Sequence, residues 1–438
     1  MIKKIVAAFV LLFLSQSAFA VNVEELNTGF FTRFNDDCLN YYIETALKNN
    51  YDLKKAGNVV EQYRQQAKYS LGKELPSLSV SANYLGVHVP RLDNFQLEQN
   101  AFILPFIANY EPDFLLKNRD KTRSAKKAYE AAIYEEKSVY ISLLGDVAAV
   151  YTNILQYDYL IELQNESVKA LQGVYLADSG KYARGVINST ELHLSKQNLE
   201  NADSQLKKLE KERDTLLMQL AVLCGLSPDC INNLQRGTLA AFEYSGEIPS
   251  GVVSDVIYSR PDVMKAEKNL EKAKIDVRIA RKEFLPSFNI TGVWIFNTIA
   301  PGSFFSWESS LASILAGATQ DIFKGGMKVA NLRMQKAKYE ELFNEYRQVD
   351  LNAVKEVNTA LCIVKQDTAV DKNTLSIVQS QKKIFENAER KYNRGVISTP
   401  DYLNEYNKLL SSKQESAQAK TQRIVDYFTL YKAVGGKL

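Results

Sequence analysis

The sequence repeats itself at a spacing of 210 residues. KYARGVIN begins at Lys181 and KYNRGVIS begins at Lys391, and six of their eight positions match. Without any gap, the same offset aligns Leu75-Pro76-Ser77 with Leu285-Pro286-Ser287. Two dense clusters of matches at one shared spacing indicate a tandem duplication that covers nearly the whole chain.

The duplication divides the chain into repeats and flanking segments. We predict a first repeat over residues 21–227, a linker over 228–250 and a second repeat over 251–438. Residues 1–20 are predicted to be a signal peptide, because a basic pair precedes a short apolar stretch and Ala18-Phe19-Ala20 fits a cleavage site. An uncleaved N-terminal anchor is the alternative, although the apolar stretch is short for a membrane span.

Positive and negative charges nearly balance, with 54 Lys and Arg against 51 Asp and Glu. The net charge of +3 predicts no nucleic-acid partner. Export permits disulfide bonds, and Cys224 and Cys230 flank a short turn-forming segment, so one prediction is a local disulfide between them. Cys38 and Cys362 can pair or stay free. With two histidines and no paired CxxC motif, we predict no metal site and no cofactor.

Long stretches without Gly or Pro predict long helices. Residues 327–394 contain neither residue type, and apolar side chains recur there at intervals of three and four. A helix of that length spans roughly 100 Å at ~1.5 Å per residue. Residues 401–434 form a shorter run with a heptad spacing typical of coiled coils. The other expected helices are 42–74, 119–184, 188–223 and 254–284.

The repeated motif lies where one long helix ends and the next begins. Gly185 and Gly395 can adopt the positive φ that closes a helix C-terminus. The N-caps expected for the returning helices are Ser189 or Thr190 in the first repeat and Ser398 or Thr399 in the second, with Pro400 in the first turn. On local chemistry alone, this is a well-capped hairpin and nothing more.

Each repeat also carries two stretches in which apolar and polar residues alternate, the pattern of β-strands with two different faces. The first hairpin is expected over about residues 76–113 and the second over about 285–322. Both are long enough for tilted transmembrane strands, which need ~9–11 residues. The apolar positions are Leu78, Val80, Ala82, Tyr84, Phe102, Leu104, Phe106, Ala108, Tyr110, Phe288, Ile290, Trp294 and Phe296.

Four strands cannot close a membrane barrel, because the smallest such barrels have about eight. Open strand edges are not tolerated in lipid. Either the hairpins pack on the protein's own helices, or several chains combine their strands, in which case a cyclic trimer would supply twelve. No stretch after residue 20 reaches the ~18 apolar residues of a transmembrane helix.

In these features the chain resembles the TolC-like outer-membrane efflux and secretion channels. The resemblance is carried by the duplication, by Leu-Pro-Ser before each hairpin, by Ser259-Arg260-Pro261-Asp262-Val263 and by Tyr-x-x-Gly at both reversals. It implies a fold that is mainly α with membrane β, with a long coiled-coil helical tunnel and a trimeric twelve-stranded β-barrel of four strands per chain, built on a tandem structural repeat. It also implies a homotrimer in the lipid of the cell outer membrane, with the helical tunnel in the periplasm. Such a protein is a passive exit duct that works with a periplasmic adaptor and an inner-membrane transporter.

The resemblance also implies a gate and an adaptor-docking surface at the two reversals, which would form the periplasmic tip. Gate roles fall on Tyr392, Glu191, Asp401 and Asn404. Asn404 makes the family's second acidic ring neutral here, and Ile397 stands where the best-known member has Arg. Three Asp401 carboxylates around one axis would favour cations and could bind a divalent ion. The implied docking residues are Arg184, Gly185, Val186, Arg394, Gly395 and Val396, and the two arginines could instead compensate for the missing gate charges.

One alternative function is that of a non-porous periplasmic coiled-coil adaptor or scaffold, against which the alternating strands argue. An enzyme is the other alternative, but the sequence contains no nucleophile elbow, phosphate loop or metal-ligand cluster, so we predict that the chain is not one. Drugs, metals and secreted protein all remain open as cargo, in an efflux pump or in a type I secretion system.

Overall fold

The computed structural model describes residues 28–92, 95–247, 251, 254–298, 307 and 310–438. The predicted signal peptide and residues 248–250 of the predicted linker lie outside the described residues. The chain divides into two compact units, each of which takes segments from both sequence repeats. Unit 1 comprises the described parts of residues 1–55, 137–260 and 352–438, and unit 2 comprises residues 56–136 and the described parts of 261–351.

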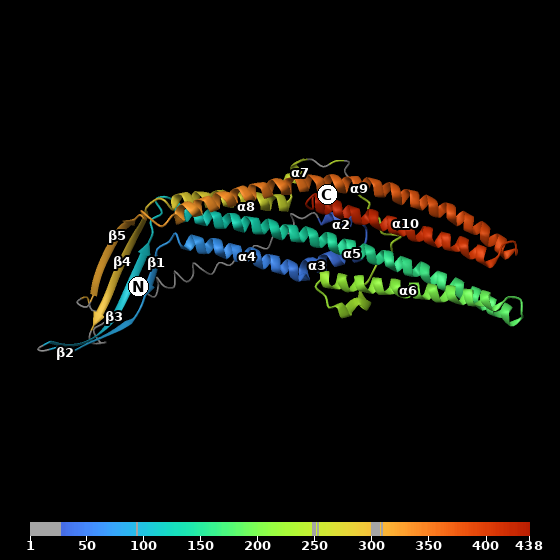
Figure 1. The fold of residues 1–438 in the computed structure, drawn as a ribbon, viewed down its shortest axis with the longest axis horizontal. Helices are drawn as coiled ribbons and strands as arrows, with labels where there is room; N and C mark the ends of the chain where they lie inside the picture. Colours follow the sequence, from blue (N-terminus) through green and yellow to red (C-terminus); the bar gives the residue numbers. More distant parts are fainter. Residues whose placement is uncertain (1–27, 93–94, 248–250, 252–253, 299–306, 308–309) are drawn as a thin grey trace. The chain divides into compact units, whose positions relative to one another are not determined.

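The helices recur at the spacing of the sequence repeat (Figure 1). Three helices of the first repeat have counterparts of equal length whose two ends lie 210 residues further along the chain. The pairs are α4 Tyr51–Gly72 with α8 Pro261–Lys282, α5 Lys117–Ala183 with α9 Met327–Asn393, and α6 Ser189–Leu223 with α10 Thr399–Ala433. The prediction of very long helices is thus confirmed, since α5 and α9 have 67 residues each.

The helices expected over 42–74 and 254–284 are each interrupted, so that part of the prediction was wrong. In the first repeat, α3 Asp37–Asn49 ends at Asn50 before α4 begins. In the second, α7 Ser254–Tyr258 ends before α8, because Pro261 disfavours helical geometry in the residue that precedes it. The two interruptions fall on Asn50 and Arg260, which are 210 residues apart.

Both interruptions are joined to the end of another helix by a side chain. Asn50 donates from Nδ2 to the Leu223 carbonyl over 2.9 Å, and its Oδ1 accepts from Leu53 N over 2.9 Å. Arg260 donates from a terminal guanidinium nitrogen to the Ala433 carbonyl over 2.7 Å. Leu223 and Ala433 are the last residues of α6 and α10, so two different side chains make the same joint in the two repeats.

The core of unit 1 is aromatic and contains a segment that the sequence analysis left unassigned. Phe30, Phe31 and Phe34, on and beside the short helix α2 Gly29–Thr32, are fully buried. The Phe30 ring stacks on Tyr431 of α10 with centroids 4.9 Å apart. Part of the predicted linker is bonded to the same unit, because Gly237 N donates to the Tyr151 hydroxyl over 2.9 Å.

One stretch of α5 is long and apolar enough for a membrane span by composition, although the sequence analysis expected none. Its apolarity matches its surroundings, because 61% of that stretch is buried inside the structure. Leu144, Tyr151 and Ile154 of α5, for example, are fully buried in the core of unit 1. We therefore assign α5 to the protein interior.

Unit 2 contains an antiparallel sheet. Its strands are β1 Ser77–Val80, β2 Asn83–Leu92, β3 Phe95–Tyr110, β4 Ser287–Thr298 and β5 Ser310–Thr319. β1 and β2 pair with β3 in one register as far as Val89, after which the β2–β3 register shifts by one residue, and β3–β4 and β4–β5 pairs complete the sheet. The first expected strand is therefore split at residues 81–82. This break lies opposite Pro105, which has no N–H to donate.

The register gives the sheet one strongly apolar face. Phe106 lies opposite both Val80 and Trp294, and Trp294 lies opposite Ala312, so these four side chains share a face. The Phe106 and Phe296 rings contact edge to face, with centroids 6.1 Å apart. The other face is mixed. It carries Ser77, Ser79, Asn109, Ser287, Asn289, Thr291 and Thr319 together with the apolar Ile107, Val293, Ile295, Leu311 and Leu315. The predicted apolar face is thus confirmed, while the opposite face is only partly polar.

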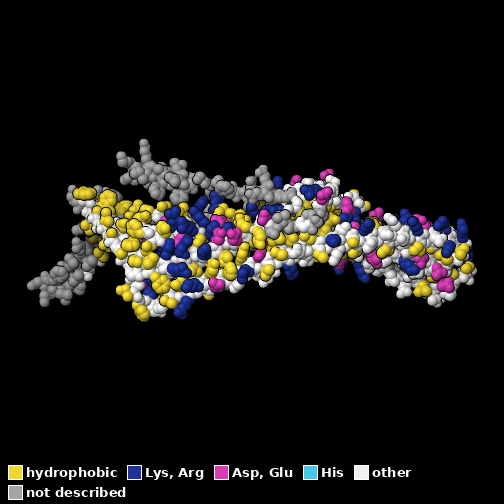
Figure 2. Space-filling model, turned by 90° about the horizontal axis from the view of Figure 1, so that it is seen from above, with side chains coloured by type: hydrophobic (Ala, Val, Ile, Leu, Met, Phe, Trp, Pro, Cys, Tyr) yellow, Lys and Arg dark blue, Asp and Glu magenta, His cyan; other side chains and the backbone are white. Residues whose placement is uncertain are grey.

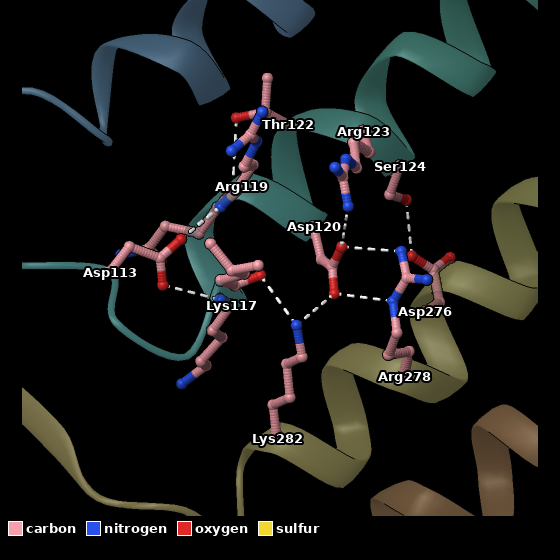
Figure 3. Close-up of polar contacts among 12 residues, drawn as sticks. Asp113, Lys117, Arg119, Asp120, Thr122, Arg123, Ser124, Asp276, Arg278 and Lys282 are labelled. Carbon is pink, nitrogen blue, oxygen red and sulfur yellow. Dashed lines mark hydrogen bonds and ion pairs between the residues drawn. The ribbon is translucent and has the colours of Figure 1, made fainter.

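A fully buried carboxylate connects α5 to α8 in unit 2 (Figure 3). Asp120 accepts two hydrogen bonds of 2.7 Å from the Arg278 guanidinium and one of 2.6 Å from Lys282, while Arg123 lies 3.3 Å away. Burial opposes ionisation of Asp120, but the hydrogen bonds from Lys282 and Arg278 hold the pKa of this carboxyl below its usual range.

The predicted disulfide is not formed. Cys224 is a free, buried thiol whose Sγ donates to the Tyr42 carbonyl over 3.6 Å, and burial raises its pKa to about 12. The Cys230 side chain lies outside the described residues. Of the two outcomes left open for Cys38 and Cys362, the structure has both as free thiols.

Candidate gate and docking surface at the helix reversals

The two helix reversals have the same backbone geometry. Gly185 and Gly395 both have a φ of 70°. Gly185 N donates to the Tyr182 carbonyl over 2.9 Å, and Gly395 N donates to the Tyr392 carbonyl over 2.8 Å. Val186 N and Val396 N each donate over 2.9 Å to the carbonyl five residues earlier. This double hydrogen-bond pattern is the Schellman motif, in which a β-carbon at the glycine would be strained.

The N-cap of the returning helix in the first repeat lies one residue before the positions predicted for it. Asn188, and neither Ser189 nor Thr190, is the N-cap of α6, because its side-chain oxygen accepts from Glu191 N over 2.9 Å. Ser398 caps α10 as predicted, since its Oγ accepts from Asp401 N over 3.3 Å. Asn is as strong a cap as Ser, and Asn188 occupies the position equivalent to Ser398.

The two acidic gate candidates also stabilise the start of their own helices. Glu191 Oε1 accepts from Asn188 Nδ2 over 3.3 Å, and Asp401 Oδ2 accepts from Ser398 Oγ over 2.6 Å. Both residues are exposed, as is Asn404. Within the part of the chain that the structure describes, no bond joins Glu191 to Asp401. A role at the start of the helix and a role in a gate are compatible, because both side chains remain exposed to solvent.

Tyr392 belongs to an aromatic cluster that only the second hairpin contains. Its ring stacks on Tyr402 of α10 with centroids 4.5 Å apart, and its hydroxyl lies 3.4 Å from Thr399 Oγ1. Phe385 lies 5.6 Å from both Tyr402 and Tyr406 by ring centroids. Contacts among these four rings hold α9 against α10 next to the reversal.

The first hairpin uses a polar contact in place of the aromatic cluster. Ser195 Oγ of α6 donates to the buried Asp178 carboxylate of α5 over 2.6 Å, and Lys181 Nζ lies 3.1 Å from the same carboxylate. The sequence reasoning missed this group, although the repeat offered a signal, because Ala388 stands at the position equivalent to Asp178. The two hairpins share a backbone and differ in what holds their helices together.

The candidate docking residues are presented to solvent on both reversals. Arg184, Val186, Arg394 and Val396 are exposed, each valine by 68%. A β-carbon on Gly185 or Gly395 would meet no atom within 4 Å, so the space around both turns is open. Each hairpin therefore presents one exposed valine at its reversal, Val186 in the first repeat and Val396 in the second.

A pair of carboxyl groups lies between α9 and α10, away from the reversals. Asp426 of α10 is 4% exposed and faces Asp367 of α9, while Gln422 Nε2 donates to Asp426 Oδ1 over 2.8 Å. Burial, and then Asp367, raise the pKa of Asp426 to about 7, although the Gln422 hydrogen bond acts in the opposite direction.

We predict that this pair makes unit 1 less stable at higher pH. A folded-state pKa above the unfolded value stabilises the folded protein fully at low pH, and this contribution is lost as the pH rises through about 7. Replacing Asp426 by Asn, which resembles the protonated acid, should remove several degrees of the fall in melting temperature between pH 5 and pH 8. Thermal unfolding of the full-length protein in detergent, followed by circular dichroism, measures this fall. An equal fall in Asp426→Asn, or a reduced fall in the exposed control Asp146→Asn, would refute the assignment.

Comparison with known proteins agrees with this architecture. The family model described as outer membrane efflux protein matches residues 42–226 and 252–436, two matches that begin 210 residues apart. The chain is 24% identical over 426 residues to the probable efflux pump outer membrane protein TtgC of Pseudomonas putida, covering 95% of this chain and 87% of TtgC. It is also 24% identical over 410 residues to the cation efflux system protein CusC of Escherichia coli K12, covering 94% and 89%.

Solved structures share the fold. The CmeC outer membrane channel of Campylobacter jejuni superposes with a TM-score of 0.89 at 25% identity, covering 94% of this chain and 88% of CmeC. The MtrE outer membrane channel of Neisseria gonorrhoeae, in its open state, superposes with a TM-score of 0.80 at 23% identity, covering 91% and 89%.

The fold, the apolar sheet face and these matches define an efflux channel of the outer membrane. The chain belongs to the outer membrane efflux protein family. It is an outer-membrane exit duct, located in the cell outer membrane with its helical part in the periplasm. The alternative of a non-porous periplasmic scaffold is not favoured.

Proposed function

We propose that three copies of this chain form one duct through which an efflux pump releases its cargo. The observation that carries this proposal is the single antiparallel sheet with an apolar face and two open edges, one formed by β1 and β2 and the other by β5. Within the described residues, each edge strand has a partner on one side only. Since open edges are unfavourable in lipid, β5 of one copy would pair with β1 and β2 of the next. Because β1 and β2 together form one edge strand, each chain contributes four strands, and three copies would close twelve strands around a pore.

The apolar face of this barrel would contact lipid and the polar face would line the pore. Ile314 on the apolar face is 83% exposed in the single chain, and Leu78 on the same face is 75% exposed. Aromatic and aliphatic side chains on the outside and Ser, Thr and Asn on the inside are the usual arrangement in membrane barrels.

We further propose that the helix reversals are the gate and the docking surface for a periplasmic adaptor. Six reversals per trimer would surround one axis, with Asp401, Glu191 and Tyr392 directed toward the constriction and Asn404 supplying a neutral ring. The exposed Val186 and Val396, flanked by Arg184 and Arg394, offer an adaptor two similar apolar contacts per chain. An inner-membrane transporter would supply the energy, and the chain would have no catalytic role. The relatives' names favour efflux of small molecules or cations over protein secretion.

Replacing Asp401 tests the proposed gate. Three carboxylates near the axis would attract cations, so Asp401→Ala should reduce the cation preference of single channels in planar bilayers by a factor of about two or more. Because Asp401 is also part of the capping box of α10, Ser398→Ala is the matched control, since it removes the hydroxyl of the N-cap and keeps the Asp401 carboxylate. An unchanged cation preference in Asp401→Ala, or an equal loss in Ser398→Ala, would refute the gate role of Asp401.

A further inference from the structure

The helix ends next to the sheet in unit 2 carry an excess of positive charge. Residues 111–128 and 278–286 contain nine Lys and Arg and four Asp and Glu. Figure 2 shows Lys and Arg side chains gathered in a band beside the apolar end of the molecule. Two of the four acidic side chains already have hydrogen-bond partners within the protein. Asp120 accepts from basic side chains, and Asp113 accepts from the backbone N–H groups of Lys117 and Arg119.

The buried Asp120 carboxylate orders two arginines and leaves net positive charge beside them. Arg278 and Arg123 each direct part of the guanidinium to Asp120, but their side chains remain 48% and 47% exposed. Lys282 adds a third cation to the single carboxylate. The remaining N–H groups of both arginines are therefore fixed in position and free to bind an anion. Guanidinium groups of this kind bind phosphate well.

Three further basic side chains extend this cluster, and none has an acidic partner among the residues that the structure describes. They are Arg119 and Lys126 of α5 and Arg281 of α8, and all three are exposed. Arg119, Arg123 and Lys126 lie on one face of α5, because they are separated by four and three residues. We call Arg119, Arg123, Lys126, Arg278 and Arg281 the basic cluster.

The α5 residues of the basic cluster point away from the polar face of the sheet. Lys117 lines a groove with Ser287 and Thr319, two residues of the polar face. At about 100° per residue, Arg119, Arg123 and Lys126 lie on the side of α5 opposite to Lys117. On the apolar side, Phe114 is 72% exposed and contacts Phe288 with ring centroids 5.4 Å apart, so the apolar face continues to the start of α5.

The distance along α5 fits the headgroup layer. At ~1.5 Å per residue, Arg123 lies roughly 9 Å from the beginning of α5 at Lys117. The polar layer on each side of a ~30 Å hydrocarbon core is ~5–8 Å thick. If the sheet ends at the hydrocarbon boundary, Arg119 lies within this layer, and the long side chains of Arg123 and Lys126, which point back toward the start of the helix, extend toward the same lipid phosphates.

We propose that the basic cluster, ordered by Asp120, binds the headgroups of anionic phospholipids in the leaflet that faces the periplasm. This proposal rests on the proposed lipid contact of the apolar sheet face. It predicts that the protein prefers phosphatidylglycerol over phosphatidylcholine, because only the former carries a net negative charge to match the cluster.

The test counts lipids bound to the full-length protein. Detergent-extracted protein is mixed with phosphatidylglycerol or phosphatidylcholine, and native mass spectrometry measures the occupancy of each. The test variant Arg119→Gln/Lys126→Gln/Arg281→Gln removes three charges that hold no acidic partner in the described structure. The control variant Lys372→Gln/Lys382→Gln/Lys383→Gln removes three exposed charges from α9 outside unit 2. Arg123→Gln is a second variant, in which Arg278 and Lys282 still neutralise Asp120.

We expect the unmodified protein and the control variant to bind phosphatidylglycerol preferentially. The triple variant should lose at least about tenfold of this preference, because each basic residue at an anionic surface contributes roughly a fivefold factor. Arg123→Gln should lose about fivefold. Equal binding of both lipids by the unmodified protein, or an undiminished preference in the triple variant, would overturn the proposal. Channel conductance is measured in parallel, and its persistence in the triple variant would separate failure of the lipid site from failure of the duct.

Discussion

Replacing Asp120 by Ala is expected to lower the free energy of unfolding by about 2–4 kcal/mol, because several charge-assisted hydrogen bonds are lost and the remaining cations are only partly buried. Asp120 is 0% exposed, and without it Arg278 and Lys282 would lose the only carboxylate to which the described structure bonds them. Thermal unfolding of the detergent-extracted protein, followed by circular dichroism, should show a fall in melting temperature of several degrees.

The exposed pair of Asp146 and Lys432 provides the control for this prediction. Their charged atoms lie 2.6 Å apart, but the side chains are 53% and 35% exposed. Exposed pairs contribute roughly 0–1 kcal/mol, so Asp146→Ala should change the melting temperature little. Equal effects of Asp120→Ala and Asp146→Ala would contradict the structural role assigned to Asp120.

Replacing Arg260 by Ala is expected to lower the free energy of unfolding by about 2–4 kcal/mol. Arg260 is 6% exposed and joins the interruption between α7 and α8 to the end of α10, through the Ala433 carbonyl and through Glu356 over 2.6 Å. Its loss would leave a buried carbonyl without its charge-assisted donor. The same unfolding measurement in detergent tests this prediction.

The first repeat offers a matched comparison for Arg260. Asn50 makes the equivalent bond to Leu223 and is neutral, so Asn50→Ala should cost about 1–2 kcal/mol, less than Arg260→Ala. A smaller effect of Arg260→Ala than of Asn50→Ala would contradict the idea that both side chains perform one joining function with different strength.

Much of the fold could be predicted because its signals are periodic. The absence of Gly and Pro predicted α9, and the 210-residue offset extended that prediction to α5, which contains three glycines. The alternation of apolar and polar residues predicted the apolar face of the sheet. Gly185 and Gly395 also adopt the positive φ that their place in the motif indicated. These features depend on local backbone preferences, which neighbouring residues in the sequence largely determine.

The features that escaped prediction depend on contacts between distant residues. Asn50 interrupts a stretch with no proline, and only its bonds to Leu53 and Leu223 explain why the chain turns there. Phe30 and Phe31 lie in a segment without a regular pattern, yet they are fully buried. Ser195 and Asp178 are ordinary polar residues in the sequence, and their partnership follows from the packing of α5 on α6.

The gate residues illustrate the same limit. The resemblance to TolC-like channels assigned them a role, and the structure adds that Glu191 and Asp401 bond to the N-cap residues of their own helices. The role of these carboxylates at a constriction depends on neighbouring copies of the chain, so it stays a prediction that the Asp401→Ala recordings test.

The proposed duct requires three copies of this chain to combine their strands into one barrel, a claim about the assembly that can be tested directly. Cryo-electron microscopy of the full-length protein, extracted from the outer membrane in detergent, tests this claim most directly. We predict three chains around one axis, with β5 of each chain paired to β1 and β2 of the next in a closed twelve-stranded barrel. A particle in which each sheet packs against its own helices, with no strand pairing between chains, would contradict the claim.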